Sequence, residues 1–148
     1  GAVLSILVEN QGRINYGFKL KDPKGITEGV RLGLQFLYDW TIHTLPLNDL
    51  AELVFKEEQN NESFTPTFYK GGFQVEVIGD TFLKLEGWTK GVAYVNGFNL
   101  GRYWEIGPQK TLYIPAPLLR EGENELIIFE LHGTGNPIVT LQDFAELD

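Results

Sequence analysis

Few residues of this sequence could carry nucleophilic or metal chemistry. The chain of 148 residues has no cysteine, and its two histidines, His43 and His132, lie far apart in strand-like segments. No Gly-x-Ser-x-Gly turn sets a serine beside a base, and no phosphate-binding Gly-rich loop occurs. Isolated histidines in strands are more often surface groups or hydrogen-bonded partners than members of a triad or a metal pair. The sequence therefore predicts no catalytic residue, no metal site and no cofactor.

Paired carboxylates are the remaining catalytic option, because the chain has 20 acidic residues. Two carboxyl groups can cleave a glycosidic bond only at a separation that the fold must set. Glu86, Glu105 and Glu130 lie nearest to aromatic residues in the sequence. Acids at strand ends are usually solvated, and we assign none of these three a role.

The stretch GWTKGVAYVNGFNLGRYW, residues 87–104, contains the clearest local signal. Its Asn96-Gly97 pair predicts a two-residue type I′ hairpin turn, since both central positions need a positive φ. The register pairs Val95 with Phe98 and Ala93 with Leu100 on one face, and Tyr94 with Asn99 and Val92 with Gly101 on the other. The first face is wholly apolar, and we expect it to lie in the core.

The other large side chains of this stretch admit two interpretations. Aromatic rings stack on the apolar faces of sugars, and polar neighbours bind sugar hydroxyl groups, so the stretch could form a carbohydrate-binding surface. Large aromatic residues also seal the ends of sandwiches and domain interfaces. The candidate substrate-binding residues are Trp88, Asn99, Arg102 and Trp104. Both interpretations stay open at the level of sequence.

Composition limits the class of protein and its partners. With 43% hydrophobic residues the chain can form one well-buried core, and we expect a single domain over residues 1–148. The net charge of −8 argues against nucleic acid and anionic membranes as partners. No apolar run could span a bilayer, and the start of the chain does not resemble a secretion signal. We expect a soluble chain and, among the compartments, favour the cytoplasm.

Short apolar runs separated by Gly, Pro, Asn and Asp are typical of antiparallel strands. The expected strands cover residues 3–8, 30–37, 39–45, 67–77, 81–85, 92–95, 98–104, 111–114, 125–132 and 138–141. So many short strands predict an all-β fold, an antiparallel β-sandwich or jelly roll. One helical segment is expected at residues 48–55, with Asn48 as its cap, and a polar loop follows at about residues 56–65.

Three motifs in order resemble the carboxyl-terminal all-β region of family 35 glycoside hydrolases, the β-galactosidases. The first is ILVENQGRINYGFKLKDPKGI, residues 6–26. The second is the pair DWTIHTLPL and PTFYKGGF, and the third is the long segment from Asp80 to Leu131. Gln11 stands where the family often has Met. The resemblance covers nearly the whole chain and implies a galactose-binding-domain-like jelly roll.

In that family, two glutamates of a (β/α)₈ barrel cleave terminal β-linked galactose with retention. A barrel needs about 250 residues and cannot fit in this chain. The resemblance therefore implies a non-catalytic β-sandwich domain of a β-galactosidase, with the catalytic barrel of the parent chain as its partner. It also implies that Tyr16, in the GRxNYG motif, reaches the sugar pocket of the barrel and that Arg13 holds its loop.

Two alternatives to this interpretation remain. Arg13 and Tyr16 could simply brace a turn between strands. The whole chain could also be an autonomous galactose-binding or carbohydrate-binding module, although a fold does not by itself provide a site.

Overall fold

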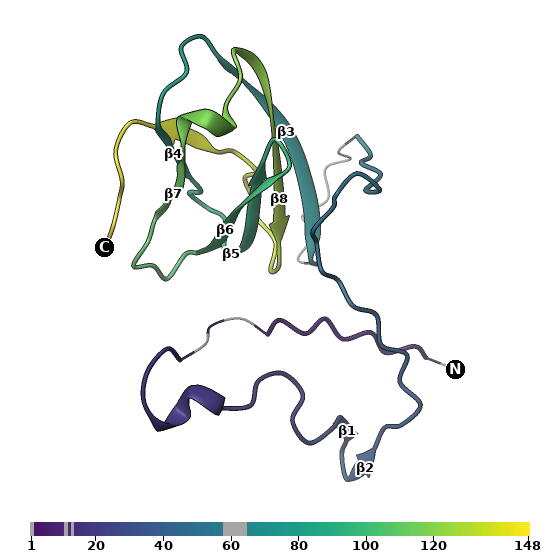
Figure 1. Ribbon diagram of the computed structural model, residues 1–148. Helices are drawn as coiled ribbons and strands as arrows, with labels where there is room; N and C mark the ends of the chain where they lie inside the picture. Colours follow the sequence, from purple (N-terminus) through teal and green to yellow (C-terminus); the bar gives the residue numbers. More distant parts are fainter. Residues whose placement is uncertain (1, 11, 13, 58–64) are drawn as a thin grey trace. The chain divides into compact units, whose positions relative to one another are not determined.

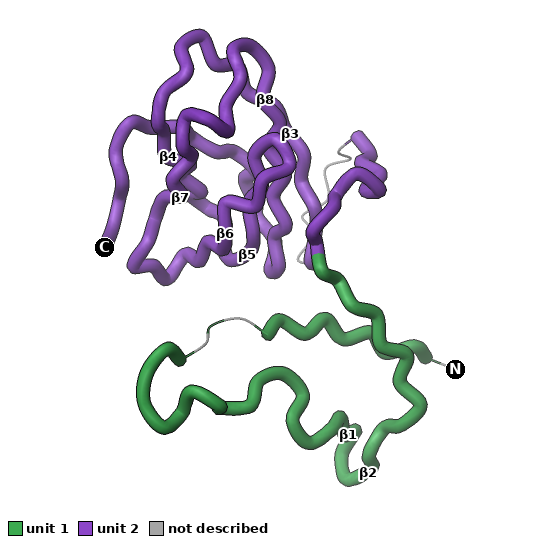
Figure 2. Tube along the Cα trace, viewed as in Figure 1, with its two compact units in different colours: residues 1–46 green, residues 47–148 purple. Residues whose placement is uncertain are grey.

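Residues 2–10, 12, 14–57 and 65–148 are described by a computed structural model of the chain. They divide into two compact units, Gly1–Pro46 (unit 1) and Leu47–Asp148 (unit 2), shown in Figure 2. The sequence predicts one domain instead. Most of the expected polar loop, at residues 58–64, lies outside the described residues, as does Arg13.

Unit 1 has little regular structure in its described part. It contains a 3₁₀ turn, η1 (Phe18–Lys21), and a small antiparallel hairpin of β1 (Arg31–Leu32) and β2 (Gln35–Phe36). The strands expected at residues 3–8 and 39–45 are absent, and the one expected at 30–37 is broken by a turn. A strand requires a neighbour to pair with, and the alternating pattern of these segments does not provide one. These strand predictions were wrong.

Unit 2 is a sandwich of two sheets, which form separate layers in Figure 1. The first sheet has the order β3 (Thr67–Val75), β8 (Gly122–Glu130), β5 (Lys90–Val95) and β6 (Phe98–Trp104), and the second has the order β7 (Thr111–Ile114), β4 (Thr81–Lys84) and β9 (Thr140–Gln142). All these neighbouring strands are antiparallel. A second 3₁₀ turn, η2 (Ala116–Leu118), leads from β7 towards β8. The predicted all-β, antiparallel sandwich is confirmed in this unit.

The main core lies between the two sheets. Strand alternation directs Ala93 and Val95 of β5 and Ile128 of β8 inward, where they meet Leu83 of β4 and Ile114 of β7. Full burial of each of the larger side chains, those of valine, leucine and isoleucine, contributes roughly 1.5–3 kcal/mol. This core holds unit 2 together.

A second apolar cluster covers the outer face of the four-stranded sheet. Val92, Tyr94 and Ile127 are buried there because the segment that begins unit 2 crosses the face and packs Leu50 and Phe55 against them. The helix expected at residues 48–55 is reduced to one turn, in which the backbone N–H of Leu53 donates to the carbonyl of Leu50. Burial of alternate apolar side chains on a sheet thus overrides the weak helical pattern.

No helix among the described residues has the length and the apolar character needed to cross a membrane.

Candidate functional site

The aromatic hairpin forms as predicted at its turn and differs along its strands. Asn96 and Gly97 have φ of 50° and 81°, as a type I′ turn requires, and Val95 pairs with Phe98. Beyond the turn a register shift leaves Leu100 as an extra residue, so that Ala93 pairs with Gly101. The predicted pairs of Ala93 with Leu100 and of Val92 with Gly101 were therefore wrong.

Local hydrogen bonding accounts for this irregularity of β6. The Asn99 side-chain oxygen accepts a hydrogen bond of 2.8 Å from the backbone N–H of Gly101, and Gly101 has a φ of 111° that suits glycine. A side chain that bonds to the backbone two residues ahead competes with a regular ladder. Phe98 was expected in the core but is exposed.

Trp88 belongs to the core and not to a ligand surface. Its side chain is 2% exposed, and its indole N–H donates a 2.8 Å hydrogen bond to the carbonyl of Ile138. Its ring meets those of Tyr69 and Tyr103 edge-on, at centroid distances of 5.0 and 6.5 Å. A ring without a free face cannot stack on a sugar, so the packing interpretation holds for Trp88.

The three other candidates of this stretch all lie on β6, where Arg102 and Trp104 are in contact. Asn99, Arg102 and Trp104 all have exposed side chains. Trp104 is 37% exposed, with the Lys90 ammonium 4.4 Å and the Arg102 guanidinium 5.7 Å from its ring centroid. Both cations are attracted to the ring by its quadrupole. This edge can offer hydrogen-bond donors and part of an aromatic face to a ligand.

Tyr16 is in unit 1 and is 88% exposed. It precedes Gly17, whose φ of 90° turns the chain into η1. Its neighbour in the predicted motif, Arg13, is outside the described residues. The structure therefore leaves the phenol ring available for a contact beyond unit 1, and the role of Tyr16 stays a prediction.

Sequence reasoning missed the most buried carboxylate of unit 2. Glu130 is fully buried at the end of β8, although acids at strand ends were expected to be solvated. Its carboxylate accepts hydrogen bonds from the backbone N–H and the hydroxyl of Thr89, from the Tyr103 hydroxyl at 2.9 Å and from the His132 backbone N–H at 2.8 Å. Strand alternation places Glu130 on the same face of β8 as Leu126 and Ile128, and this pattern in the sequence could have indicated its burial.

These hydrogen bonds decide the charge state of Glu130. Burial raises the pKa of its carboxyl group, but the hydrogen bonds from Thr89, His132 and Tyr103 outweigh burial and lower the pKa below its usual value. Burial and the nearby negative charge of Glu130 raise the pKa of the Tyr103 phenol. A charged carboxylate and a neutral phenol at this position connect three strands, and neither has an open side for a substrate.

Gly91 makes this arrangement possible. It pairs with Tyr103 on one side and with Glu130 on the other. A Cβ atom at Gly91 would overlap the carbonyl oxygen of Phe129 and would lie 2.7 Å from the Tyr103 hydroxyl. Only glycine leaves room for the Tyr103 side chain to cross β5 and reach Glu130.

A second buried polar network locks the hairpin turn to β8. Asn124 is 1% exposed, and its side-chain oxygen accepts hydrogen bonds of 2.8 Å from the Asn96 amide and 2.9 Å from the Arg120 backbone N–H. Asn124 in turn donates to the carbonyls of Arg120 and Gly122. Its polar atoms are thus satisfied within the domain.

A hollow of about 390 Å³ lies beside this turn. Its lining includes Lys70, Asn96, Arg120, Glu125 and the ring of Phe55. Lys70 and Glu125 form an ion pair of 2.5 Å, and the Lys70 ammonium lies 5.6 Å from the Phe55 ring centroid. Two of the charged groups that line the hollow, Lys70 and Glu125, thus already neutralise each other.

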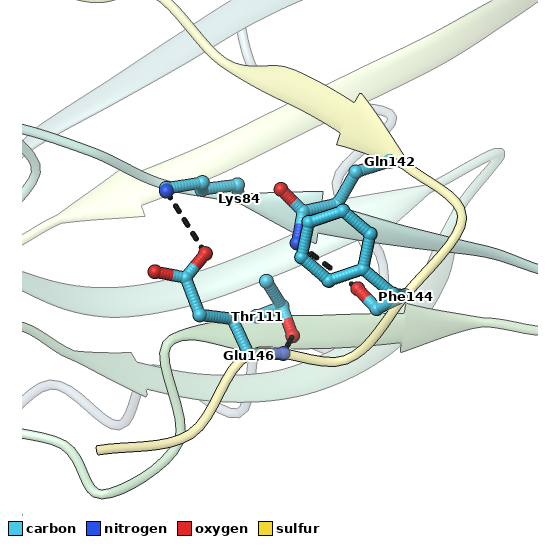
Figure 3. A network of polar contacts seen from close by, with 5 residues as sticks. All are labelled: Lys84, Thr111, Gln142, Phe144 and Glu146. Carbon is cyan, nitrogen blue, oxygen red and sulfur yellow. Dashed lines mark hydrogen bonds and ion pairs between the residues drawn. The ribbon is translucent and has the colours of Figure 1, made fainter.

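Polar contacts also fasten the end of the chain to the three-stranded sheet (Figure 3). The Lys84 ammonium lies 2.9 Å from the Glu146 carboxylate, and the Glu146 backbone N–H donates to the Thr111 hydroxyl at 3.0 Å. The Gln142 amide donates to the carbonyl of Phe144 at 3.0 Å. No group of three His, Asp or Glu residues within the described ranges could hold a metal ion.

Comparisons with known proteins agree with the division into two units. A family model described as the first all-beta domain of beta-galactosidase matches residues 1–47, and one described as the galactose-binding domain of beta-galactosidase matches residues 66–124. The first match ends at residue 47, one residue after the end of unit 1.

Curated relatives point to the same family. Beta-galactosidase 8 of Oryza sativa subsp. japonica is 38% identical over 172 residues, and the alignment covers 94% of this chain and 25% of that protein. Beta-galactosidase 1 of Dictyostelium discoideum is 46% identical over 147 residues, with 94% and 22% covered. Beta-galactosidase-1-like protein 2 of Homo sapiens is 45% identical over 137 residues, with 86% and 21% covered.

The chain spans about a quarter of the length of these curated relatives. The family models and the relatives confirm the resemblance that the three sequence motifs indicate. The chain therefore belongs to the beta-galactosidase family and carries sequence of its first all-beta domain and of its galactose-binding domain.

Proposed function

We propose that residues 1–148 are non-catalytic domains of a longer β-galactosidase, in which a catalytic (β/α)₈ barrel of the same polypeptide hydrolyses terminal β-galactosides. The family membership and the short share of each relative that the chain spans support this proposal. In unit 2 the most buried carboxylate, Glu130, is enclosed by hydrogen bonds. The two domains then support the barrel and contribute to its sugar site.

The exposed apolar side chains of unit 1 are the observation on which the supporting role rests. Leu34 is 96% exposed, and Val3, Phe18 and Ile42 are nearly as exposed. None of the buried residues that form the hydrophobic clusters comes from unit 1 among the described residues. Soluble domains rarely leave so many large apolar groups in water unless another surface covers them. Contact with the rest of the parent polypeptide would bury them.

Hydroxyl-radical footprinting tests this role. The oxidation rates of Phe18 and Leu34 are measured by mass spectrometry in the chain of residues 1–148 and in the full-length protein. We expect both residues to be oxidised several-fold more slowly in the full-length protein. Equal rates in the two proteins would contradict a supporting contact through unit 1.

Tyr16 is proposed as the residue through which unit 1 reaches the sugar site. Its phenol is exposed and is held next to a glycine turn. In the full-length enzyme, Tyr16→Ala is expected to lower kcat/KM for a galactoside while the melting temperature stays unchanged. Tyr38→Ala is the matched control, since Tyr38 is an exposed tyrosine of the same unit. Unchanged kinetics of Tyr16→Ala would remove this role.

Autonomous sugar binding by unit 2 is a second candidate, favoured by the exposed side chains of Asn99, Arg102 and Trp104 on one strand. An NMR titration of the chain with galactose and lactose would show saturable shifts near Trp104. Trp104→Ala should abolish those shifts, whereas Phe98→Ala, at the exposed turn of the same hairpin, should retain them. A titration without shifts at any residue would reject this candidate.

A further inference from the structure

The last residues of the chain, 143–148, are held as a strap across the outer face of the three-stranded sheet. We call them the C-terminal strap. Glu146 is tied to Lys84 and Thr111, and its carbonyl accepts a 3.0 Å hydrogen bond from the Lys110 backbone N–H. Asp148 donates its backbone N–H to the Pro108 carbonyl at 2.9 Å and pairs with the Lys110 ammonium at 2.9 Å. A segment held by this many hydrogen bonds and ion pairs does not fray as an ordinary chain terminus does.

The strap covers Thr111 on this face and leaves Tyr113 exposed. Thr111 is buried under Glu146, whereas the next outward side chain of β7, Tyr113, is 47% exposed. Tyr113 packs against Phe82 of β4 at a centroid distance of 5.4 Å. Phe144, on the strap, is 58% exposed although its carbonyl is bound by Gln142. Two aromatic side chains, Tyr113 and Phe144, are thus exposed to solvent, and the Tyr113 ring is packed against Phe82.

Three polar groups near Phe82 and Tyr113 already have partners within unit 2, namely Lys84, Glu146 and Asp80. The hydrogen bond between Lys84 and Glu146 raises the pKa of the lysine and lowers that of the glutamate, so both stay charged and cancel each other. The hydrogen bonds from the Ala116 backbone and the Tyr113 hydroxyl lower the pKa of Asp80. The Asp80 carboxylate accepts hydrogen bonds within unit 2, and the charges of Lys84 and Glu146 cancel, so these groups need no polar partner from a surface that covers Phe82 and Tyr113. The rings of Phe82 and Tyr113 are inclined at 44°, so they do not form one flat platform for a sugar ring.

We propose that Phe82, Tyr113 and Phe144 form a docking face for an apolar surface of the same parent polypeptide outside residues 1–148. This inference rests on the proposed function, and it adds the face of unit 2 that would contact the rest of the parent polypeptide. The relatives supply the argument for the occupant, because about three quarters of each lies outside the aligned segment. Aromatic residues are enriched at protein interfaces, and contiguous exposed apolar patches mark such interfaces.

Hydroxyl-radical footprinting of the full-length protein tests the docking face, with an internal control. The oxidation rates of Tyr113 and Phe144 are compared with that of Phe98, an exposed aromatic residue at the hairpin turn. In the full-length protein we expect Tyr113 and Phe144 to be protected several-fold relative to the same residues in the chain of residues 1–148, and Phe98 to be unchanged. A double variant, Tyr113→Ser and Phe144→Ser, should lower the melting temperature of the full-length protein more than Phe98→Ser does.

The outcomes separate this inference from the proposed function. Protection of Phe18 and Leu34 without protection of Tyr113 and Phe144 would overturn the docking face and leave the supporting role of unit 1 intact. Slow oxidation of Tyr113 and Phe144 already in the chain of residues 1–148 would mean that unit 1 or a second copy of the chain covers the face. This result would also overturn the proposal. Protection of Tyr113 and Phe144 only in the full-length protein supports it.

Discussion

Units 1 and 2 have similar apolar sequence patterns but use them differently. In unit 2, β8 has a partner on each side, and its Leu126, Ile127 and Ile128 are all buried. In unit 1, the segment at residues 3–8 is a similar apolar run but has no partner strand, and its apolar side chains are exposed. An apolar run of this kind therefore suits a strand but does not supply the partner that a strand needs.

The largest effect is expected where unit 2 has no spare space. Gly91→Ala should lower the free energy of unfolding by about 3 kcal/mol or more, because the new Cβ would overlap the Phe129 carbonyl and force β5 away from β8. Urea denaturation of the chain measures the change. Gly71→Ala on β3 is the control, since no atom lies within 4 Å of the Cβ position there. Equal losses for both variants would contradict the tight packing of β5.

Glu130→Gln tests the buried carboxylate of the same strand pair. The amide would turn a donor towards the N–H groups of Thr89 or His132, and the free energy of unfolding should fall by about 2–3 kcal/mol. Glu123→Gln, at an exposed position of β8, is the matched control. A loss no greater than that of the control would mean that the Glu130 network does not stabilise unit 2.

The pH dependence of stability provides a further check on Glu130. Its pKa in the folded protein lies below the usual 4.5, so its contribution is complete above that value and is lost as the pH falls through the folded pKa. The free energy of unfolding, measured from neutral pH down to about pH 3, should therefore fall less steeply for Glu130→Gln than for the natural chain. If the free energy of unfolding fell equally steeply with pH in both proteins, a group other than Glu130 would take up the proton that destabilises the fold.

Removal of the second polar network should have a smaller effect. Asn124→Ala leaves the carbonyls of Arg120 and Gly122 without their donor and should cost about 1–3 kcal/mol. Loss of order at the turn should accompany it, visible as faster amide hydrogen exchange at Gly97. Asn99→Ala, which removes one hydrogen bond at an exposed position, is the control.

The smallest effect is expected in unit 1. In the chain of residues 1–148, Leu34→Ser should change the free energy of unfolding by no more than about 0.5 kcal/mol, because Leu34 buries almost no surface. The same change at Leu83, in the core of unit 2, should unfold the domain. If Leu34→Ser were strongly destabilising in this chain, unit 1 would have a core of its own and the comparison would fail.

Sequence reasoning predicted the fold of unit 2 well, and the reason is local. Strand positions such as those of β6 and β7 follow from alternation, and the turn at Asn96 follows from the demand for positive φ. The register beyond that turn was not predictable from alternation, because the extra residue Leu100 depends on how Asn99 bonds to Gly101.

The candidate site was less predictable because burial is a property of the whole sandwich. Trp88 and Trp104 look alike in sequence, yet the strand order buries the first and leaves the second at an edge. The sequence of β8 suggests a solvated acid at Glu130, because its donors lie elsewhere: just before β5, on β6 and in the loop after β8. Pairing between strands that are distant in the sequence decides which of these side chains are buried. No single segment encodes that pairing.

The irregular strand β6 also has a consequence for self-association. As an outer strand of its sheet, it could act as a template for strands of other molecules and so promote aggregation. The extra residue at Leu100 interrupts its backbone repeat, and the cations of Lys90 and Arg102 flank its last residue, Trp104. A flat, evenly hydrogen-bonded ribbon is therefore not available to another chain, and stacking of one sandwich upon the next in a fibril is opposed at this edge.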